Sequence, residues 1–299
     1  TTEIYTLSLH DALPIWMGRL PVGTPKIMIS TVASGDVAPY VGPNDIAMLY
    51  SVVDLAGLNS ISRKVLGNAA NMMAGAVTRP LPDAVVPEKP ALGLTMFGVT
   101  TPCITEIRRL LDDRNECFVF HATGTGGQCF EKLVDSGLIS AALDITTTEV
   151  ADHLFGGVLA CTEDRFGAVI RRRIPWVGSV GAVDMVNFGP RATVPDKFRD
   201  RQFYQHNPTV TLMRTTPEEN RRLGEEIGRK AAAATGPAAI LLPLKGVSAI
   251  DAAGKPFDDP AAREALFAGI RATHGAVPVV ELDRHINDVE FADAAVERL

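Results

Sequence analysis

CFVFHATGTGG, residues 117–127, passes from an apolar run directly into a glycine-rich turn. The amphipathic segment 128–136 follows and predicts a helix. A strand, a glycine-rich turn and a helix in this order form the usual anion-binding unit of α/β proteins, because glycines let backbone N–H groups approach an anion and the helix N-terminus adds positive charge. The glycine spacing matches neither the dinucleotide-binding nor the P-loop pattern. An anion site and a plain strand-to-helix turn therefore both stay open.

Apolar runs alternate with amphipathic stretches along the chain, which predicts a mostly parallel sheet with helices on both faces. The expected strands are 26–29, 92–97, 117–120, 141–145, 176–180, 209–213, 239–242 and 277–282. The expected helices are 45–56, 61–77, one opening at Thr101-Pro102, 128–136, 216–234, 259–273 and 288–298. Thr101 and Thr216 are the expected N-caps, and Glu219 completes a capping box with Thr216. Residues 184–187 and His206 are expected in loops.

The chain divides at a proline-rich stretch. Four prolines within residues 79–90 mark a linker, so we place a boundary at 79–91 between a first domain, 16–78, and a second, 92–299. Residues 1–15, TTEIYTLSLHDALPI, have no initiator Met and resemble translated sequencing adapter. We expect them to be a non-native leader.

The composition is that of an ordinary globular protein, with 46% hydrophobic and 21% charged residues. The net charge of −6 argues against a nucleic-acid partner. No apolar run reaches the roughly 18 residues of a membrane span. The four cysteines contain no Cys-x-x-Cys pair, which favours a reducing cytoplasm over a disulfide framework or a zinc site. We therefore expect a cytoplasmic protein that binds a small molecule and no membrane.

Residues that follow the predicted strands are the site candidates, because parallel sheets bind ligands beyond the carboxyl ends of their strands. Many of them are small or carry hydroxyls, which suits phosphate or carboxylate oxygens. The strongest candidates in the second domain are Gly124, Thr125, Gly126 and Gly127, and the weaker ones are Asp184, Asn187, Arg214, Lys245 and Ser248. For a single Ser or Thr, the capping of a helix is the competing interpretation.

His121 lies directly before the glycine-rich turn, where it could act as a general base or contact an anion. A hydrogen-bonded structural histidine is the equally open alternative. Asp283, His285 and Asp288 are close in sequence, but His285 and Asp288 share one loop-to-helix turn. We therefore predict no metal site.

Six segments resemble the Tm-one-like ATP-binding family and occur in the family's order. They include FHATGTGG and GAVDMVNFG, and they span residues 23–70, 120–127, 143–157, 181–189, 206–220 and 242–260. The resemblance implies two Rossmann-like α/β subdomains with mostly parallel sheets, an ATP site with or without Mg²⁺, and a homodimer. It attaches no enzymatic reaction.

The resemblance also implies that the first subdomain is incomplete here, because family members carry a further stretch with its own strands before residue 23. It places most nucleotide contacts in that subdomain. The candidates that remain from them are Ser30, Thr31, Ser34 and Gly35. We expect nucleotide binding to be impaired, and a helix over 45–56 to expose Ile46, Leu49 and Val53, which would lower solubility.

Three functions follow from these observations. The leading one is a nucleotide-binding protein, with ATP as the nucleotide and an unknown reaction. The second is an enzyme that holds a carboxylate or phosphate substrate between His121, the glycine-rich turn and Lys245, with His121 as base. The third is an ATP-modulated interaction module, since in the plant member that gives the family its name this region inhibits a viral replication protein.

Overall fold

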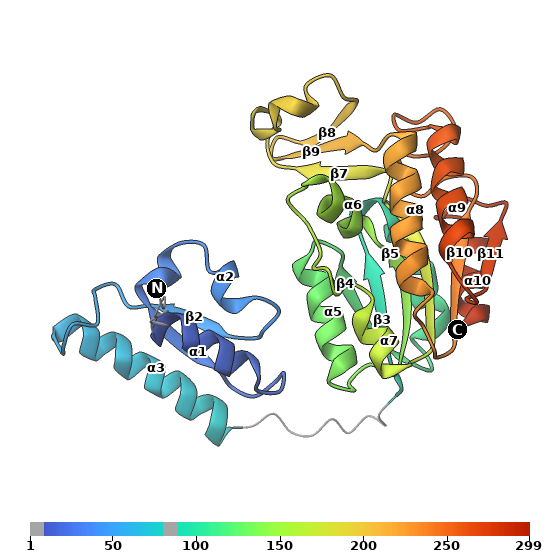
Figure 1. Cartoon of the computed structure of the whole chain (residues 1–299). Coiled ribbons are helices and arrows are strands. Elements are labelled where there is room, and N and C mark those ends of the chain that lie inside the picture. The colour runs from blue at the N-terminus through green and yellow to red at the C-terminus, as the bar shows by residue number, and fades with distance from the viewer. Residues whose placement is uncertain (1–8, 80–88) are drawn as a thin grey trace, which may run out of the picture. The chain divides into compact units, whose positions relative to one another are not determined.

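The computed structural model describes residues 9–79 and 89–299. It divides into two compact units, Thr1–Pro87 and Glu88–Leu299, which we treat separately (Figure 1). Residues 1–8 of the expected leader and 80–88 of the expected linker lie outside the described residues.

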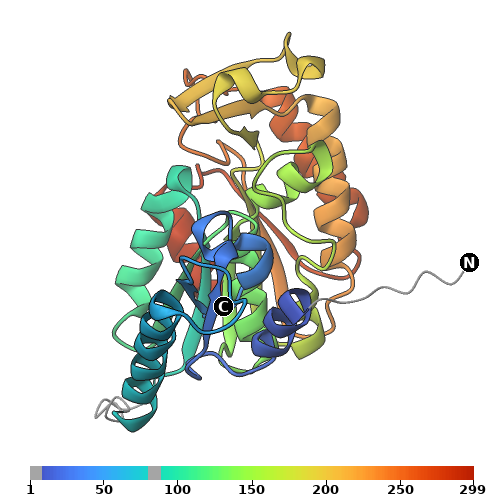
Figure 2. The same cartoon turned by 90° about the vertical axis from the view of Figure 1, so that its left-hand side faces the viewer.

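Unit 1 is built on a two-stranded parallel sheet, in which β1 (Ile27–Ser30) pairs with β2 (Ala47–Tyr50). Its helices are α1 (Leu9–Gly18), the one-turn α2 (Ala38–Val41) and α3 (Ser60–Thr78), and a short 3₁₀ turn, η1, covers Thr31–Ser34. The long helix α3, drawn in blue-green in Figure 2, confirms the helix expected over 61–77. A capping box between Asn59 and Ser62 explains where it begins.

The helix expected over 45–56 is wrong, because residues 47–50 form β2. Ile46 and Leu49 fit a helical spacing, but so short an apolar run fits a strand equally well, and parallel pairing of Ala47 with Ile27 decides between them. Val52, with a φ of 66°, ends the extended segment. Ile46 is consequently buried, and Leu49 and Val53 are half-buried, whereas we expected all three to be exposed.

Unit 2 contains a six-stranded, wholly parallel sheet, which confirms the expected α/β class and its Rossmann-like character. The strand order is β11-β10-β6-β5-β3-β4. The strands are β3 (Ala91–Met96), β4 (Glu116–His121), β5 (Ala141–Thr146), β6 (Trp176–Gly181), β10 (Ala238–Pro243) and β11 (Val279–Leu282). The chain moves outward from β3 to β4 and then returns past β3 to β5, so the order of winding reverses there.

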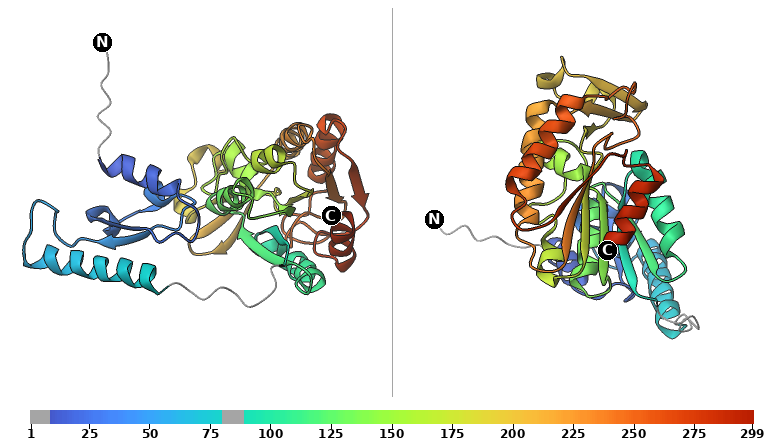
Figure 3. Two further views of the ribbon diagram at one scale, coloured as in Figure 1. Left: turned by 90° about the horizontal axis from the view of Figure 1, so that it is seen from below. Right: turned by 90° about the vertical axis from the view of Figure 1, so that its right-hand side faces the viewer.

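Helices cover both faces of this sheet. On one face α4 (Thr101–Leu111) packs beside α10 (Val289–Arg298), and their apolar residues form one core with the strands. The other face carries α5 (Thr125–Asp135), α6 (Thr148–Phe155), α7 (Gly167–Arg172), α8 (Pro217–Ala231) and α9 (Pro260–Thr273). Helices α8 and α9 lie side by side (Figure 3). Within the described residues, no helix combines the length and apolar character needed to cross a bilayer.

The helix starts were partly predicted. The capping box of Thr216 and Glu219 is confirmed, with the Thr216 side chain accepting from the Glu219 N–H at 3.2 Å. Thr100, not Thr101, occupies the N-cap position of α4. Helix α5 begins at Thr125 rather than at 128, because the turn itself closes at Gly124, whose φ is 76°.

A three-stranded antiparallel sheet lies at one end of the parallel strands and was not predicted (Figure 1). It consists of β7 (Met185–Phe188), β8 (Phe203–Asn207) and β9 (Val210–Arg214), in the order β7-β9-β8. Residues 184–187 and His206, which we expected in loops, therefore lie in or next to strands. Every residue of β7 is buried, and β8 is largely polar, so neither shows the alternation that identifies a strand.

Candidate functional site

The glycine-rich turn encloses a carboxylate of the chain itself. The N–H of Gly124 donates to Oε2 of Glu149 at 2.7 Å. Gly127 lies so close to the same side chain that a Cβ there would be 2.0 Å from Oε1 of Glu149. In this structure the Gly124 N–H is engaged by Glu149, and binding of an external anion by the turn stays a prediction.

Glu149 belongs to a buried ionic cluster around Arg165. Arg165 donates to Oε1 of Glu149 at 2.6 Å and to both oxygens of Asp144 at 2.6 and 2.7 Å. Glu131 lies 3.8 Å from the guanidinium and accepts the Phe166 N–H at 2.5 Å. Burial raises the pKa of Glu131 to about 7, although Arg165 opposes the rise. Three carboxyl groups therefore surround one cation.

A hollow of about 320 Å³ opens beyond the carboxyl ends of β3 and β4, under the β8–β9 hairpin. We call it the edge pocket. Its lining is mostly apolar with a few polar side chains, and consists of Phe97, Gly98, Val99, His121, Thr123, Leu159, His206, Asn207, Val210 and Leu212. It lies next to β3, where the winding of the sheet reverses, which is the usual ligand position in open α/β sheets.

His121 is the one catalytic candidate that the structure places in this pocket. Its ring centroid lies 5.2 Å from that of Phe97, with the planes tilted by 48°. Partial burial lowers the pKa of His121, so the imidazole is neutral at pH 7. Among the described residues, none forms a hydrogen bond to the ring. A neutral, accessible imidazole can donate or accept a hydrogen bond, or take a proton.

Three of the weaker candidates meet in a buried polar cluster outside the edge pocket. Ser248 donates to Oδ2 of Asp184 at 2.8 Å. The Arg214 guanidinium donates to Asp251 at 3.3 Å and to the carbonyls of Phe257 and Asp184. Burial, reinforced by the neighbouring Asp251, raises the pKa of Asp184. These contacts hold β7 and β9 against the loop after β10, so we assign Arg214 a structural role.

The other two weaker candidates are also engaged elsewhere. Asn187 donates to Oδ1 of Asp152 at 3.0 Å and is buried. Lys245 pairs with Asp283 at 2.8 Å on an exposed surface. Neither lines the edge pocket. His285 directs Nε2 at the Ser248 carbonyl at 2.8 Å, and within the described residues no three His, Cys, Asp or Glu side chains are placed to hold a metal ion.

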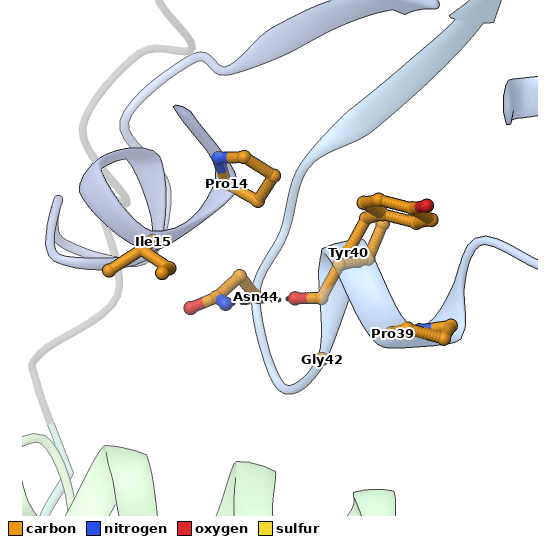
Figure 4. A pocket seen from close by; sticks show the side chains of 7 residues that line it. Pro14, Ile15, Pro39, Tyr40, Gly42 and Asn44 are labelled. Carbon is orange, nitrogen blue, oxygen red and sulfur yellow. Dashed lines mark hydrogen bonds between the residues drawn. The ribbon is translucent and has the colours of Figure 1, made fainter. Parts of the chain in front are cut away.

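In unit 1 the four candidates form one closed turn after β1. Ser30 caps η1 through the Val32 N–H at 3.2 Å, Ser34 donates to the Thr31 carbonyl at 2.9 Å, and Gly35 donates to Val32 at 3.0 Å. These bonds make the turn a local capping structure, and nucleotide contact by the four residues stays a prediction. A separate hollow of about 420 Å³ in this unit is lined by Pro14, Ile15, Pro39, Tyr40, Val41, Gly42 and Asn44 (Figure 4). None of the four candidates lines it.

Sequence reasoning missed most of the edge pocket. Phe97 ends a predicted strand, and residues at strand ends were the site candidates. It was missed because we selected mainly polar residues at these positions. His206 and Leu212 come from the antiparallel sheet. No local sequence pattern predicts that this sheet folds over the parallel strands.

Comparison with known proteins identifies the family. Residues 89–299 match the uncharacterised protein family UPF0261 C-terminal domain, and residues 12–82 match its N-terminal domain. A UPF0261 protein of Rhizobium meliloti (strain 1021) is 55% identical over 283 residues, which cover 94% of this chain and 71% of that protein. The ToMV resistance protein Tm-1(GCR237) of Solanum lycopersicum is 46% identical over 286 residues, 93% of this chain and 38% of the tomato protein. The chain therefore belongs to the UPF0261 family, the Tm-1-like family that its sequence motifs resemble.

Proposed function

We propose that this chain is a nucleotide-binding protein, with ATP as the first candidate ligand, and that the base and sugar occupy the edge pocket. The position of the pocket carries the proposal. It lies beyond the carboxyl ends of β3 and β4, where open parallel sheets hold their ligands.

The lining suits a planar ring with a polar edge. Phe97 and His121 offer aromatic faces, and apolar side chains such as Val210 form the remaining wall. His121, Thr123 and Asn207 supply the few hydrogen-bonding groups that fix orientation in a small-molecule site. At about 320 Å³ the pocket is at the lower end of the usual range of roughly 300–1,000 Å³, which suits a nucleoside better than a whole triphosphate.

The phosphates of a bound nucleotide would extend out of the pocket. None of the ten lining residues is Lys or Arg. The Gly124 N–H, the nearest expected phosphate donor, is bonded to Glu149. We therefore expect adenosine to bind within about tenfold of ATP, because the phosphates find no cation at the site.

Calorimetric titration of the whole chain with ATP, ADP and adenosine, each with and without Mg²⁺, tests this proposal. A pocket-filling variant, Val210→Trp, should abolish binding, whereas Phe155→Ala on α6, outside the lining, should leave it unchanged. Absence of binding by the unmodified chain, or binding that survives Val210→Trp, would refute the site.

A second candidate is an enzyme that uses His121 as general base. The neutral imidazole that faces the pocket favours it. Lys245 is left out of this proposal, because it lies outside the pocket lining and pairs with Asp283. Phosphorus NMR of ATP incubated with the chain and with His121→Ala tests the idea, and equal rates of phosphate release would eliminate His121 as the base.

The tomato relatives are named for resistance and susceptibility to ToMV, and those names describe the tomato proteins. For this chain we correspondingly propose an interaction module in which a bound nucleotide stiffens the binding surface. We also propose a cytoplasmic homodimer. Sedimentation with and without ATP tests the homodimer and its dependence on nucleotide, since a module of this kind should bind a second copy more tightly with nucleotide present.

A further inference from the structure

We propose that Glu149 is a resident anion of the glycine-rich turn and acts as the positioning residue of the edge pocket. Its carboxylate takes the place that a bound phosphate would take in a ligand-binding turn, and it fixes the backbone that carries Thr123 and follows His121. The link to ligand binding rests on the proposed function. The role of Glu149 in holding the turn does not.

The glycines of the turn are closely packed, and one of them lies against this carboxylate. Gly124 adopts a φ of 76°, and a Cβ there would lie 2.4 Å from the Ala160 carbonyl. At Gly126 a Cβ would meet the His121 carbonyl at 1.7 Å, and at Gly127 it would meet Glu149 at 2.0 Å. Real Cβ atoms do not approach so closely, so each glycine is required by a different neighbour. Only Gly127 is required by Glu149 itself.

Arg165 holds the Glu149 carboxylate in place. Glu149 lies in the first turn of α6 and is fully buried. Arg165 donates its Nε–H to Oε1 at 2.6 Å, which leaves Oε2 for the Gly124 N–H at 2.7 Å. Arg165 is itself held by its two bonds to Asp144, and Thr95 donates to Asp144 at 2.7 Å. The turn is thereby tied through Glu149 and Arg165 to β5 and β3 in the centre of the sheet.

The same turn forms a wall of the edge pocket. Thr123 donates to the His121 carbonyl from its N–H at 2.8 Å and from its hydroxyl at 3.2 Å, and both residues line the pocket. Leu159, in the loop after α6, also lines the pocket. Its carbonyl would lie 3.1 Å from a Cβ at Gly124. Release of Gly124 would therefore loosen the wall that His121 and Thr123 form.

Chemical rescue tests the proposal. Glu149→Ala removes the carboxylate and leaves a space that suits an anion, because the Arg165 guanidinium and the Gly124 N–H border it. Added acetate can fill this space. We expect this variant to unfold several degrees below the unmodified chain and to bind adenosine at least about tenfold more weakly. Sodium acetate should restore both properties, whereas sodium chloride at the same ionic strength should not. The matched control is Glu163→Ala, an exposed glutamate whose removal should change neither property and give no response to acetate.

The outcomes separate the two proposals. Loss without any acetate response would overturn the resident-anion role. Acetate rescue of stability with adenosine affinity unchanged throughout would overturn the positioning role. Rescue of stability in a protein whose unmodified form binds no nucleotide would uphold the anion role and defeat the proposed function alone.

Hydrogen exchange on the unmodified chain gives a test that needs no variant. The Gly124 amide should exchange at least about tenfold more slowly than the exposed turn amide of Gly254, which donates to Asp258. Equal exchange at the two glycines would overturn the proposal even if Glu149→Ala does not fold.

Discussion

Phe97 and His121 lie with their ring centroids 5.2 Å apart at the ends of two adjacent parallel strands. The register explains the contact, because Met96 of β3 pairs with His121 of β4 and Phe97 is the next residue. The two rings form the aromatic part of the edge pocket and give it its expected preference for a planar ligand.

Replacing Phe97 should weaken ligand binding more than it weakens the fold. Phe97 is half-buried, and Phe97→Ala removes one of the two ring faces. We predict a loss of about tenfold in adenosine affinity, equivalent to about 1.4 kcal/mol, measured by calorimetry. Phe155→Ala, a half-buried aromatic outside the pocket, is the control, and an equal loss in both variants would contradict the assignment.

Ligand affinity should fall in acid. Partial burial lowers the pKa of His121 below its ordinary value of 6.5, so the ring is neutral at pH 7 and gains its charge only at lower pH. If the ligand needs the neutral imidazole, affinity falls by about tenfold per pH unit once the pH is below that pKa. Titrations from about pH 7.5 to 5 check this slope. His121→Gln should remove the slope, and a slope retained in that variant would assign it to another group.

Gly127→Ala should destabilise unit 2, since its Cβ would overlap the buried Glu149 carboxylate. Overpacking of this kind costs about 1–3 kcal/mol, measured by denaturant unfolding. Gly67→Ala in α3 is the matched control, because nothing lies within 4 Å of its Cβ and alanine favours a helix interior by about 0.5–1 kcal/mol. A neutral Gly127→Ala would show that the carboxylate is not held against the turn.

The stability of unit 2 should decline from mildly acidic to mildly alkaline pH through Glu131, whose pKa is raised to about 7 by burial. A carboxyl whose pKa is higher in the folded than in the unfolded chain stabilises the fold below its unfolded pKa, and that contribution is lost as the pH rises through the folded pKa. Glu131→Gln should flatten the dependence by on the order of 2 kcal/mol between about pH 5 and 8. Glu163→Gln, at an exposed site, should leave the dependence as it is.

Unit 1 should promote self-association, because it exposes large apolar side chains. Leu58 is 67% exposed, Trp16 65% and Val77 61%. We predict that Leu58→Ser with Val77→Ser lowers the scattering of concentrated solutions without loss of helix content. Light scattering and circular dichroism measure the two quantities. Unchanged scattering would show that these side chains are not the cause.

Most of the parallel sheet could be predicted because its strands are apolar runs bounded by clear turn and cap signals, as at β5 and β10. The errors occurred where local pattern and tertiary pairing differ. Residues 47–50 are a strand because β1 is beside them, and β7 is a strand because β9 is. Strands were expected at both partners, but a window of a few residues does not show which segments pair.

The site could be predicted only in part. The sequence located the glycine-rich turn and His121, but the carboxylate that fills the turn comes from α6, a short helix that was not predicted. The sequence also favoured polar residues as ligand contacts. Arg214 instead donates to the Asp184 carbonyl and to Asp251 inside the fold. The apolar residues Phe97 and Leu212, in contrast, line the open hollow.

A backbone NMR titration of the whole chain with adenosine would show whether the edge pocket receives the nucleoside part of a nucleotide. Adenosine bound in the edge pocket should give saturable shifts confined to the amides of residues 97–99, 121–123, 159 and 206–212. Shifts centred on residues 30–35, or none at saturating adenosine, would contradict it.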